Sequence, residues 1–127
     1  AVEIPITPLP GPEILAGSTR MKAGTATKLV LNMLSTAAMI RLGLVFGNLM
    51  VNVQPRNTKL EDRARRIVAQ ATGVDRDIAG ALLKQAGNDV KTAIVMGRLG
   101  ISKENAERRL REAAGRVSRA LKGRSAR

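Results

Sequence analysis

The chain has 127 residues, 44% of them apolar, so it suits one ordinary domain or two very small ones. It contains no cysteine and no histidine, which excludes disulfides, thiolate metal sites and a histidine general base, and we expect neither a metal nor a cofactor. The formal net charge is +12, and Phe46 is the only aromatic residue, so Ala, Leu, Ile, Val and Met must build the core, of which Ala, Leu and Met favour helices.

The N-terminal segment, residues 1–17, changes character twice. Residues 1–7 alternate like a short strand but have no partner nearby, as if they were the last strand of a sheet whose other strands are missing. Residues 7–12 are rich in proline and predict a stiff connector, and one helical turn is expected to end at Gly17. We therefore expect the chain to be a fragment of a longer protein.

Residues 17–28 form the most distinctive polar stretch, with three cations, four hydroxyl side chains, two glycines and no carboxylate. An apolar run follows at once, which predicts a loop at the N-terminus of a helix, where unpaired N–H groups and the helix dipole favour an anion. Hydroxyls can surround a phosphate while Lys or Arg neutralises it. We predict that this loop binds a phosphorylated ligand; the candidate contacts are Glu13, Ser18, Thr19, Arg20, Lys22, Thr25 and Lys28.

A simpler interpretation of this loop stays open. Its hydroxyls would only cap the helix, and Lys22 and Lys28 would be solvated. If the loop binds a sugar phosphate, Glu13 is placed to contact a hydroxyl of the sugar. On the simpler interpretation Glu13 is merely exposed. No two carboxylates suited to acid–base work on one substrate are evident, so we expect no catalytic residue in this chain.

A long helix is predicted from Ser18 or Gly24 to Leu42, because apolar residues recur at helical spacing, and Gly43 ends it. Its apolar residues fall on two faces, and such a helix is normally covered on both sides. One face suits a sheet and the other a second subunit or the helices that follow, so residues 28–42 predict a homodimer contact. The stretch is too short and too polar to span a bilayer, and without a visible signal peptide we expect a cytoplasmic protein.

Residues 44–56 predict a short extended segment, and residues 57–127 a helical bundle. Thr58 and Glu61 form a capping box in front of a helix that Gly73 ends. The expected inner face of this helix consists of Leu60, Ala64, Ile67, Val68 and Ala71.

The bundle contains an internal repeat, since residues 73–96 match residues 100–123 at a constant offset of 27 positions. Each unit predicts an N-cap, a helix, a tight turn and a second helix, with Asp75 and Ser102 as the caps. The turns are expected at Gly87-Asn88 and Ala114-Gly115, and a polar, basic tail follows. The identical pairs are Gly73/Gly100, Ala79/Ala106, Leu83/Leu110, Ala86/Ala113, Val90/Val117 and Ala93/Ala120.

Most of the positive charge lies in the second half, where residues 58–127 carry seventeen Lys/Arg and eight Asp/Glu. A basic module for nucleic acid or another protein is one interpretation. Solvated helix faces are the favoured one, and nucleic acid is not an expected partner, because base stacking needs aromatic side chains. Asp62 with Arg66, and Glu107 with Arg111, stand at helical spacing and predict surface ion pairs.

Several ordered motifs occur together in residues 11–36 (GPEILAGSTRMKAGTATKLVLNMLST), 39–43 (MIRLG), 47–51 (GNLMV) and 57–60 (NTKL), and in the helical segments around residues 87–96 (GNDVKTAIVM). In this respect the chain closely resembles the bacterial N-acetylmuramic acid 6-phosphate etherase family, and more distantly the glucokinase regulatory protein.

The resemblance implies a fold and an activity. Residues 1–56 would be the end of a truncated sugar isomerase (SIS) domain, contributing its last strand and long helix, so the fragment is mainly α although the whole SIS domain is α/β. Residues 57–127 would be the helical bundle, with a ubiquitin-associated-like fold at residues 67–99. The family cleaves the lactyl ether of N-acetylmuramic acid 6-phosphate to N-acetylglucosamine 6-phosphate and D-lactate by elimination and hydration, which recycles cell-wall sugars in the cytoplasm.

The resemblance also implies what this chain lacks. The family's acid–base glutamates and its main Ser/Thr phosphate loop precede this stretch, so the parent would be a carbon–oxygen lyase while the fragment alone is inactive. The implied ligand is a phosphorylated amino sugar at the site of this subunit or its neighbour, and the favoured contacts are Ser18, Thr19, Arg20 and Lys22, with Lys28 ranked after them. A SIS-type regulatory protein that binds a sugar phosphate is the alternative.

Overall fold

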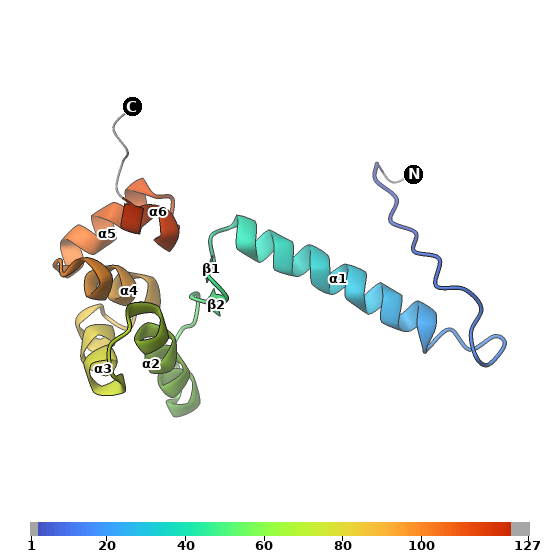
Figure 1. The fold of residues 1–127 in the computed structure, drawn as a ribbon, viewed down its shortest axis with the longest axis horizontal. Coiled ribbons are helices and arrows are strands. Elements are labelled where there is room, and N and C mark those ends of the chain that lie inside the picture. The colour runs from blue at the N-terminus through green and yellow to red at the C-terminus, as the bar shows by residue number, and fades with distance from the viewer. Residues whose placement is uncertain (1–2, 123–127) are drawn as a thin grey trace. The chain divides into compact units, whose positions relative to one another are not determined.

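A computed structural model describes residues 3–122 of the chain. Within that range the fold is mainly α, as predicted, with six helices and one two-stranded hairpin (Figure 1). The chain divides into two compact units, Ala1–Ala38 and Met39–Arg127, and the division falls inside the first helix. Among residues 3–122, no helix is both long enough and apolar enough to cross a membrane.

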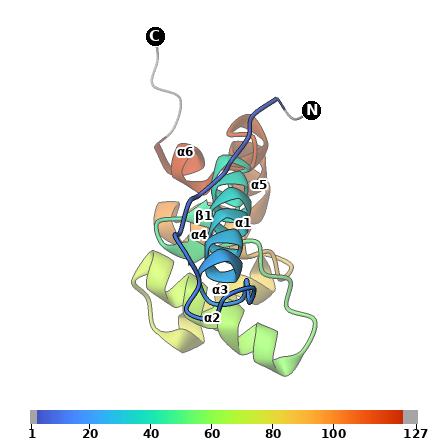
Figure 2. The same cartoon turned by 90° about the vertical axis from the view of Figure 1, so that its right-hand side faces the viewer.

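The first unit is an irregular segment followed by most of α1 (Lys22–Arg41), which starts between the two predicted starts (Figure 2). The strand predicted for residues 1–7 is wrong over residues 3–7, and residues 1–2 lie outside the described range. A strand needs a hydrogen-bonded neighbour, and the described residues offer none to this segment. The predicted helical turn is a simple turn, in which the N–H of Ser18 donates to the carbonyl of Leu15 at 3.0 Å.

The end of α1 is closed by its own backbone, as the glycine at position 43 predicts. Gly43 has φ +73°, and its N–H donates to the carbonyl of Ile40 at 3.0 Å. The N–H of Leu44 donates to the carbonyl of Met39 at 3.1 Å. These two bonds form a Schellman motif, which lets a helix end sharply at a left-handed glycine.

The extended segment predicted after α1 is a small antiparallel hairpin of β1 (Val45–Phe46) and β2 (Leu49–Met50). Val45 pairs with Met50, and Phe46 pairs with Leu49. The chain beyond the hairpin inserts Val51 and Val53, both buried, into the core of the second unit. These two valines therefore belong to the core of the second unit.

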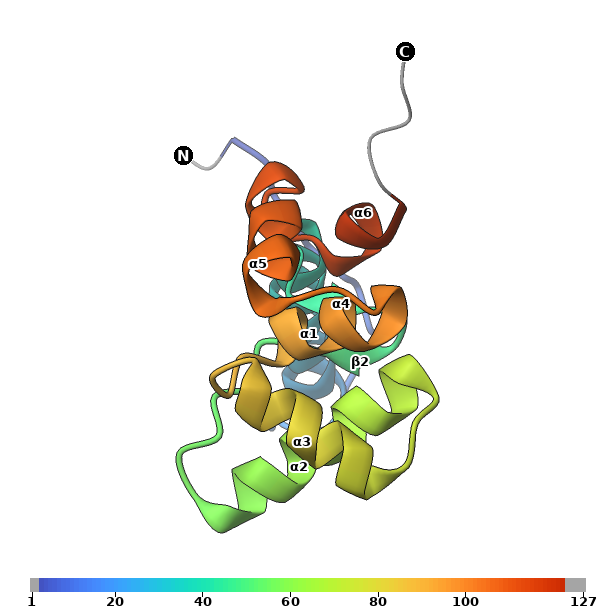
Figure 3. The same ribbon diagram turned by 90° about the vertical axis from the view of Figure 1, so that its left-hand side faces the viewer.

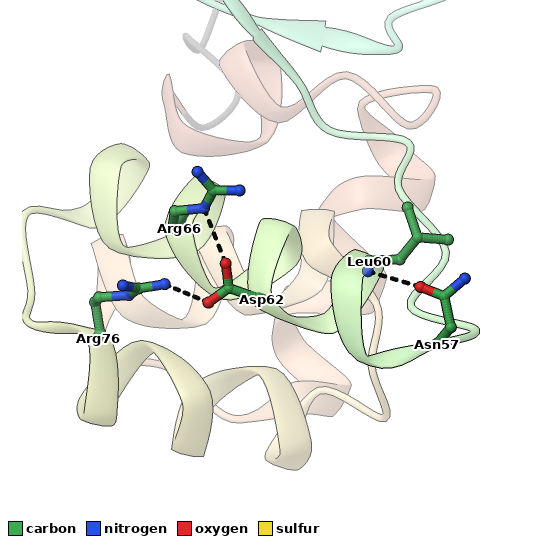
Figure 4. A network of polar contacts seen from close by, with 5 residues as sticks. All are labelled: Asn57, Leu60, Asp62, Arg66 and Arg76. Carbon is green, nitrogen blue, oxygen red and sulfur yellow. Dashed lines mark hydrogen bonds and ion pairs between the residues drawn. The ribbon is translucent and has the colours of Figure 1, made fainter.

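Helix α2 (Thr58–Thr72) has the predicted inner face, with Ala64, Ile67, Val68 and Ala71 buried, and ends at Gly73 with φ +83°. The predicted cap is wrong by one residue. Asn57, not Thr58, is the N-cap, and its side-chain oxygen accepts from the N–H of Leu60 at 2.9 Å (Figure 4). Asn and Thr are both good caps, but an N-cap residue has a non-helical backbone. Asn57 has an extended backbone, whereas Thr58 is already in the helix.

The predicted repeat is present in the structure. Its first copy contains α3 (Arg76–Gln85) and α4 (Val90–Leu99), and its second contains α5 (Lys103–Glu112) and α6 (Val117–Lys122), all visible in Figure 3. The start of every helix keeps the offset of 27 residues, and Asp75 and Ser102 are the N-caps of α3 and α5, as predicted. The identical apolar residues are the buried ones, namely Ala79/Ala106, Leu83/Leu110, Ala86/Ala113, Val90/Val117 and Ala93/Ala120.

Even the turns of the repeat match in backbone conformation. Gly87 and Asn88 have φ +67° and +65°, and their counterparts Ala114 and Gly115 have φ +52° and +71°. The N–H of Asn88 donates to the carbonyl of Leu83 at 2.9 Å, and the N–H of Gly115 donates to that of Leu110 at 2.7 Å. Both copies therefore reverse direction through the same hydrogen-bonded turn, which lets their short helices stack into one core.

Candidate functional site

The N-terminus of α1 carries an anion that comes from the chain itself. The Glu13 carboxylate accepts hydrogen bonds from the N–H of Lys22 at 3.2 and 3.1 Å, through its two oxygens, and from the N–H of Ala23 at 3.0 Å. These are the first two N–H groups of the helix, which have no partner inside it. Glu13 thus caps α1 from nine residues upstream, a role that the sequence did not predict.

The turn between Glu13 and α1 makes this cap possible. Gly17 has φ +80°, a conformation that glycine adopts without a steric penalty, and the Leu15–Ser18 hydrogen bond closes the turn. The chain is thereby reversed, and the carboxylate reaches the positive end of the helix dipole. An anion does lie at this helix terminus, and in this structure it is Glu13.

A shallow, open hollow of about 430 Å³ runs along α1 next to this terminus. Two predicted contacts, Thr19 and Lys28, line it. Thr27 and Asn32 line it as well, and the sequence analysis did not select them. Their signal was available, because residues four apart on a helix share a face, and Lys28 and Asn32 are so spaced. The complete lining is Thr19, Ala23, Gly24, Thr27, Lys28, Leu31 and Asn32.

The other predicted contacts do not line the hollow. Arg20, Lys22 and Thr25 are exposed, and Ser18 is half-buried. Within residues 3–122 all ion pairs lie between positions 62 and 111, so no loop cation is paired with a carboxylate there. Three uncompensated cations close in sequence, Arg20, Lys22 and Lys28, suit an anionic ligand.

Both surface ion pairs predicted for the second unit, Asp62 with Arg66 and Glu107 with Arg111, are present. Asp62 pairs with Arg66 at 3.3 Å and also with Arg76 on α3 (Figure 4). Glu107 pairs with Arg111 at 4.0 Å and with Lys103 at 3.8 Å. Among residues 3–122, no three acidic side chains are grouped so that they could hold a metal ion.

No family model matches the chain, but several known proteins are similar to it over most of its length. The N-acetylmuramic acid 6-phosphate etherase of Deinococcus radiodurans is 54% identical over 121 residues, which is 95% of this chain and 40% of that protein. The Serratia proteamaculans etherase is 54% identical over 94% of this chain and 40% of its own length. The Rubrobacter xylanophilus etherase is 55% identical over 94% of this chain and 39% of its own.

The predicted resemblance to the N-acetylmuramic acid 6-phosphate etherase family is confirmed. The matched part is the C-terminal portion of these etherases. The chain spans about 40% of the length of the etherases it matches.

Proposed function

We propose that this chain is part of a sugar-phosphate etherase, a carbon–oxygen lyase that cleaves the lactyl ether of N-acetylmuramic acid 6-phosphate. The products would be N-acetylglucosamine 6-phosphate and D-lactate, formed by elimination and hydration during cytoplasmic recycling of cell-wall sugars. The observation that carries the proposal is the 54% identity with an etherase over 95% of this chain. The loop at α1, with its unpaired cations, supports it independently.

The contribution of this chain would be to bind the phosphate of the amino sugar. A phosphate carries about 1.5 to 2 negative charges at neutral pH. Arg20, Lys22 and Lys28 supply the compensating charge, and the hydroxyls of Ser18, Thr19 and Thr25 supply neutral donors. Glu13 already occupies the N–H groups of Lys22 and Ala23. The phosphate would therefore be held by side chains, and Glu13 would order the loop that presents them.

The acid–base groups would come from outside this chain. Before α2 the only carboxylates are Glu3 and Glu13, and Glu13 is engaged with the helix terminus. Elimination needs a group that removes a proton and one that protonates the leaving group, and Glu3 and Glu13 are not evident as a pair suited to both roles on one substrate. We therefore expect the chain alone to be catalytically inactive.

The uncovered surface of α1 is part of the same proposal. None of its residues is buried, and Leu31 and Met33 are 60% and 62% exposed. A 20-residue helix with this much apolar surface is normally covered. Residues 1–56 are proposed as the end of a SIS domain, so the covering partners would be the rest of that domain and a second copy meeting residues 28–42 in a homodimer.

A chimera tests the proposed function. This chain would replace the matching portion of the Deinococcus radiodurans etherase, and release of D-lactate from N-acetylmuramic acid 6-phosphate would be measured. We expect the chimera to turn over, and the 127-residue chain alone to release none. A folded chimera that binds N-acetylglucosamine 6-phosphate without turnover would favour a sugar-phosphate-binding regulatory protein instead. Turnover by the chain alone would contradict the proposal that this chain binds the phosphate while the acid–base groups come from outside it.

A further inference from the structure

One carbonyl in the last turn of α1 receives no hydrogen bond from the Schellman motif. That motif satisfies the carbonyls of Met39 and Ile40, as described above. The carbonyl oxygen of Arg41 accepts instead from Nη2 of Arg116, a residue 75 positions later in the sequence. A guanidinium is well placed there, because the C-terminal end of a helix carries partial negative charge. Met39–Arg41 and Arg116 belong to the same compact unit.

The contact is close-packed as well as polar. Gly43 is buried, and a Cβ added to it would lie 2.6 Å from Cγ and 3.6 Å from Cα of Arg116. The side-chain stem of Arg116 therefore fills the space that any other residue at position 43 would need. The left-handed φ of +73° at Gly43 would in addition strain any other residue.

Arg116 differs in role from its counterpart in the first copy of the repeat. Its counterpart 27 residues earlier is Asp89, whose carboxylate caps α4 by accepting from the N–H of Thr92 at 2.7 Å. A guanidinium has no acceptor, so Arg116 cannot cap α6 in the same way. The second copy thus lacks the side-chain N-cap of the first copy at a position whose side chain contacts the end of α1.

We propose that Arg116 is a clamp that fastens the second copy of the repeat to the C-terminal end of α1. Its side chain does not cap α6. Instead it donates a hydrogen bond to the carbonyl of Arg41 and packs against Gly43. The clamp keeps the junction of residues 39–44 ordered independently of the stability of the bundle. This proposal does not depend on the chemistry of the loop before α1.

The test is amide hydrogen exchange on the whole 127-residue chain, comparing Arg116→Asp with the native protein. We expect exchange at the amides of Gly43 and Leu44 to rise at least about tenfold, while the amides of α4 change little. The substitution restores the carboxylate found in the first copy, so exchange at the amide of Arg119 should slow. Arg119→Asp is the control, because it changes the charge of α6 equally at an exposed position.

Two results would overturn the clamp. One is unchanged exchange at Gly43 and Leu44, and the other is an equal rise throughout α4, which would mean a general loss of stability. Arg116→Lys, which retains the positive charge and most of the stem, provides a milder second variant. It should raise exchange at the same two amides by less than Arg116→Asp does.

Discussion

The carboxylate of Glu13 lies 3.0 Å from the backbone nitrogen of Ala23, so the residue that follows the proline-rich segment caps the longest helix among residues 3–122. This bond links the two features that define the candidate site, the cationic loop and the start of α1. It also determines which groups remain for a ligand, since the two terminal N–H groups are taken. The loop side chains then become the main expected phosphate contacts.

Removing this cap should loosen the start of α1. Glu13→Ala deletes the acceptor, and loss of a helix N-cap typically costs about 0.5–2 kcal/mol. We expect faster hydrogen exchange at the amides of Lys22 and Ala23, with no change in α3 or α4. Glu13→Gln retains an acceptor oxygen and should lose less. The exposed Glu3→Ala is the control, and equal exchange in both alanine variants would contradict the capping role.

The left-handed turns of the repeat predict a stabilising substitution. Ala114 has φ +52° where the first copy has Gly87 at φ +67°. The left-handed conformation destabilises the folded state by roughly 1–2 kcal/mol when the residue is not glycine. Glycine removes this strain, but it also makes the unfolded chain more flexible, which offsets part of the gain. Ala114→Gly should therefore raise the free energy of unfolding by about 1 kcal/mol.

Its matched control is the reverse change in the first copy. Gly87→Ala places a Cβ 3.0 Å from Nζ of Lys103, a flexible group that can move away, so the left-handed backbone dominates the effect. We expect a loss of about 1 kcal/mol, measured by urea denaturation. Two variants that shift stability in the same direction would contradict the equivalence of the turns.

Much of the second unit follows from its sequence because local signals repeat there. Caps, left-handed turns and buried alanines recur at one offset, so each copy supports the assignment of the other. The Asn57 cap was missed because adjacent Asn and Thr are nearly equivalent locally. The strand at residues 1–7 fails for a different reason, since strand formation depends on partners that the described residues do not contain.

The loop was harder to predict than the bundle. Its composition predicted the start of a helix, and α1 does begin in this stretch at Lys22, but the Glu13 contact depends on the path of residues 14–21. No periodic pattern encodes that path. Thr27 and Asn32 were not among the predicted contacts because hydroxyl and amide groups inside a helix are usually solvated, although Asn32 shares a helix face with Lys28 and both line the hollow.

The exposed apolar surface of α1 predicts self-association of the isolated chain. Leu29 and Met33 are four residues apart, share a face of the helix, and are 55% and 62% exposed. Replacing both with Glu should shift the chain toward monomer in sedimentation velocity, because charges in an apolar contact are costly to bury. Lys59→Glu on α2 is the control. A native chain that stays monomeric at high concentration would contradict the proposed dimer contact.

The central claim is that the loop of this chain binds the phosphate of the etherase substrate, and the chimera tests it most directly. Arg20→Ala and Lys22→Ala would be made in the chimera, and kcat/KM for N-acetylmuramic acid 6-phosphate would be measured beside Lys59→Ala. We predict that each loop variant loses at least about tenfold, or about 1.4 kcal/mol of transition-state stabilisation, while the control keeps the native value. An active chimera in which both loop variants lose less than about tenfold would contradict the claim.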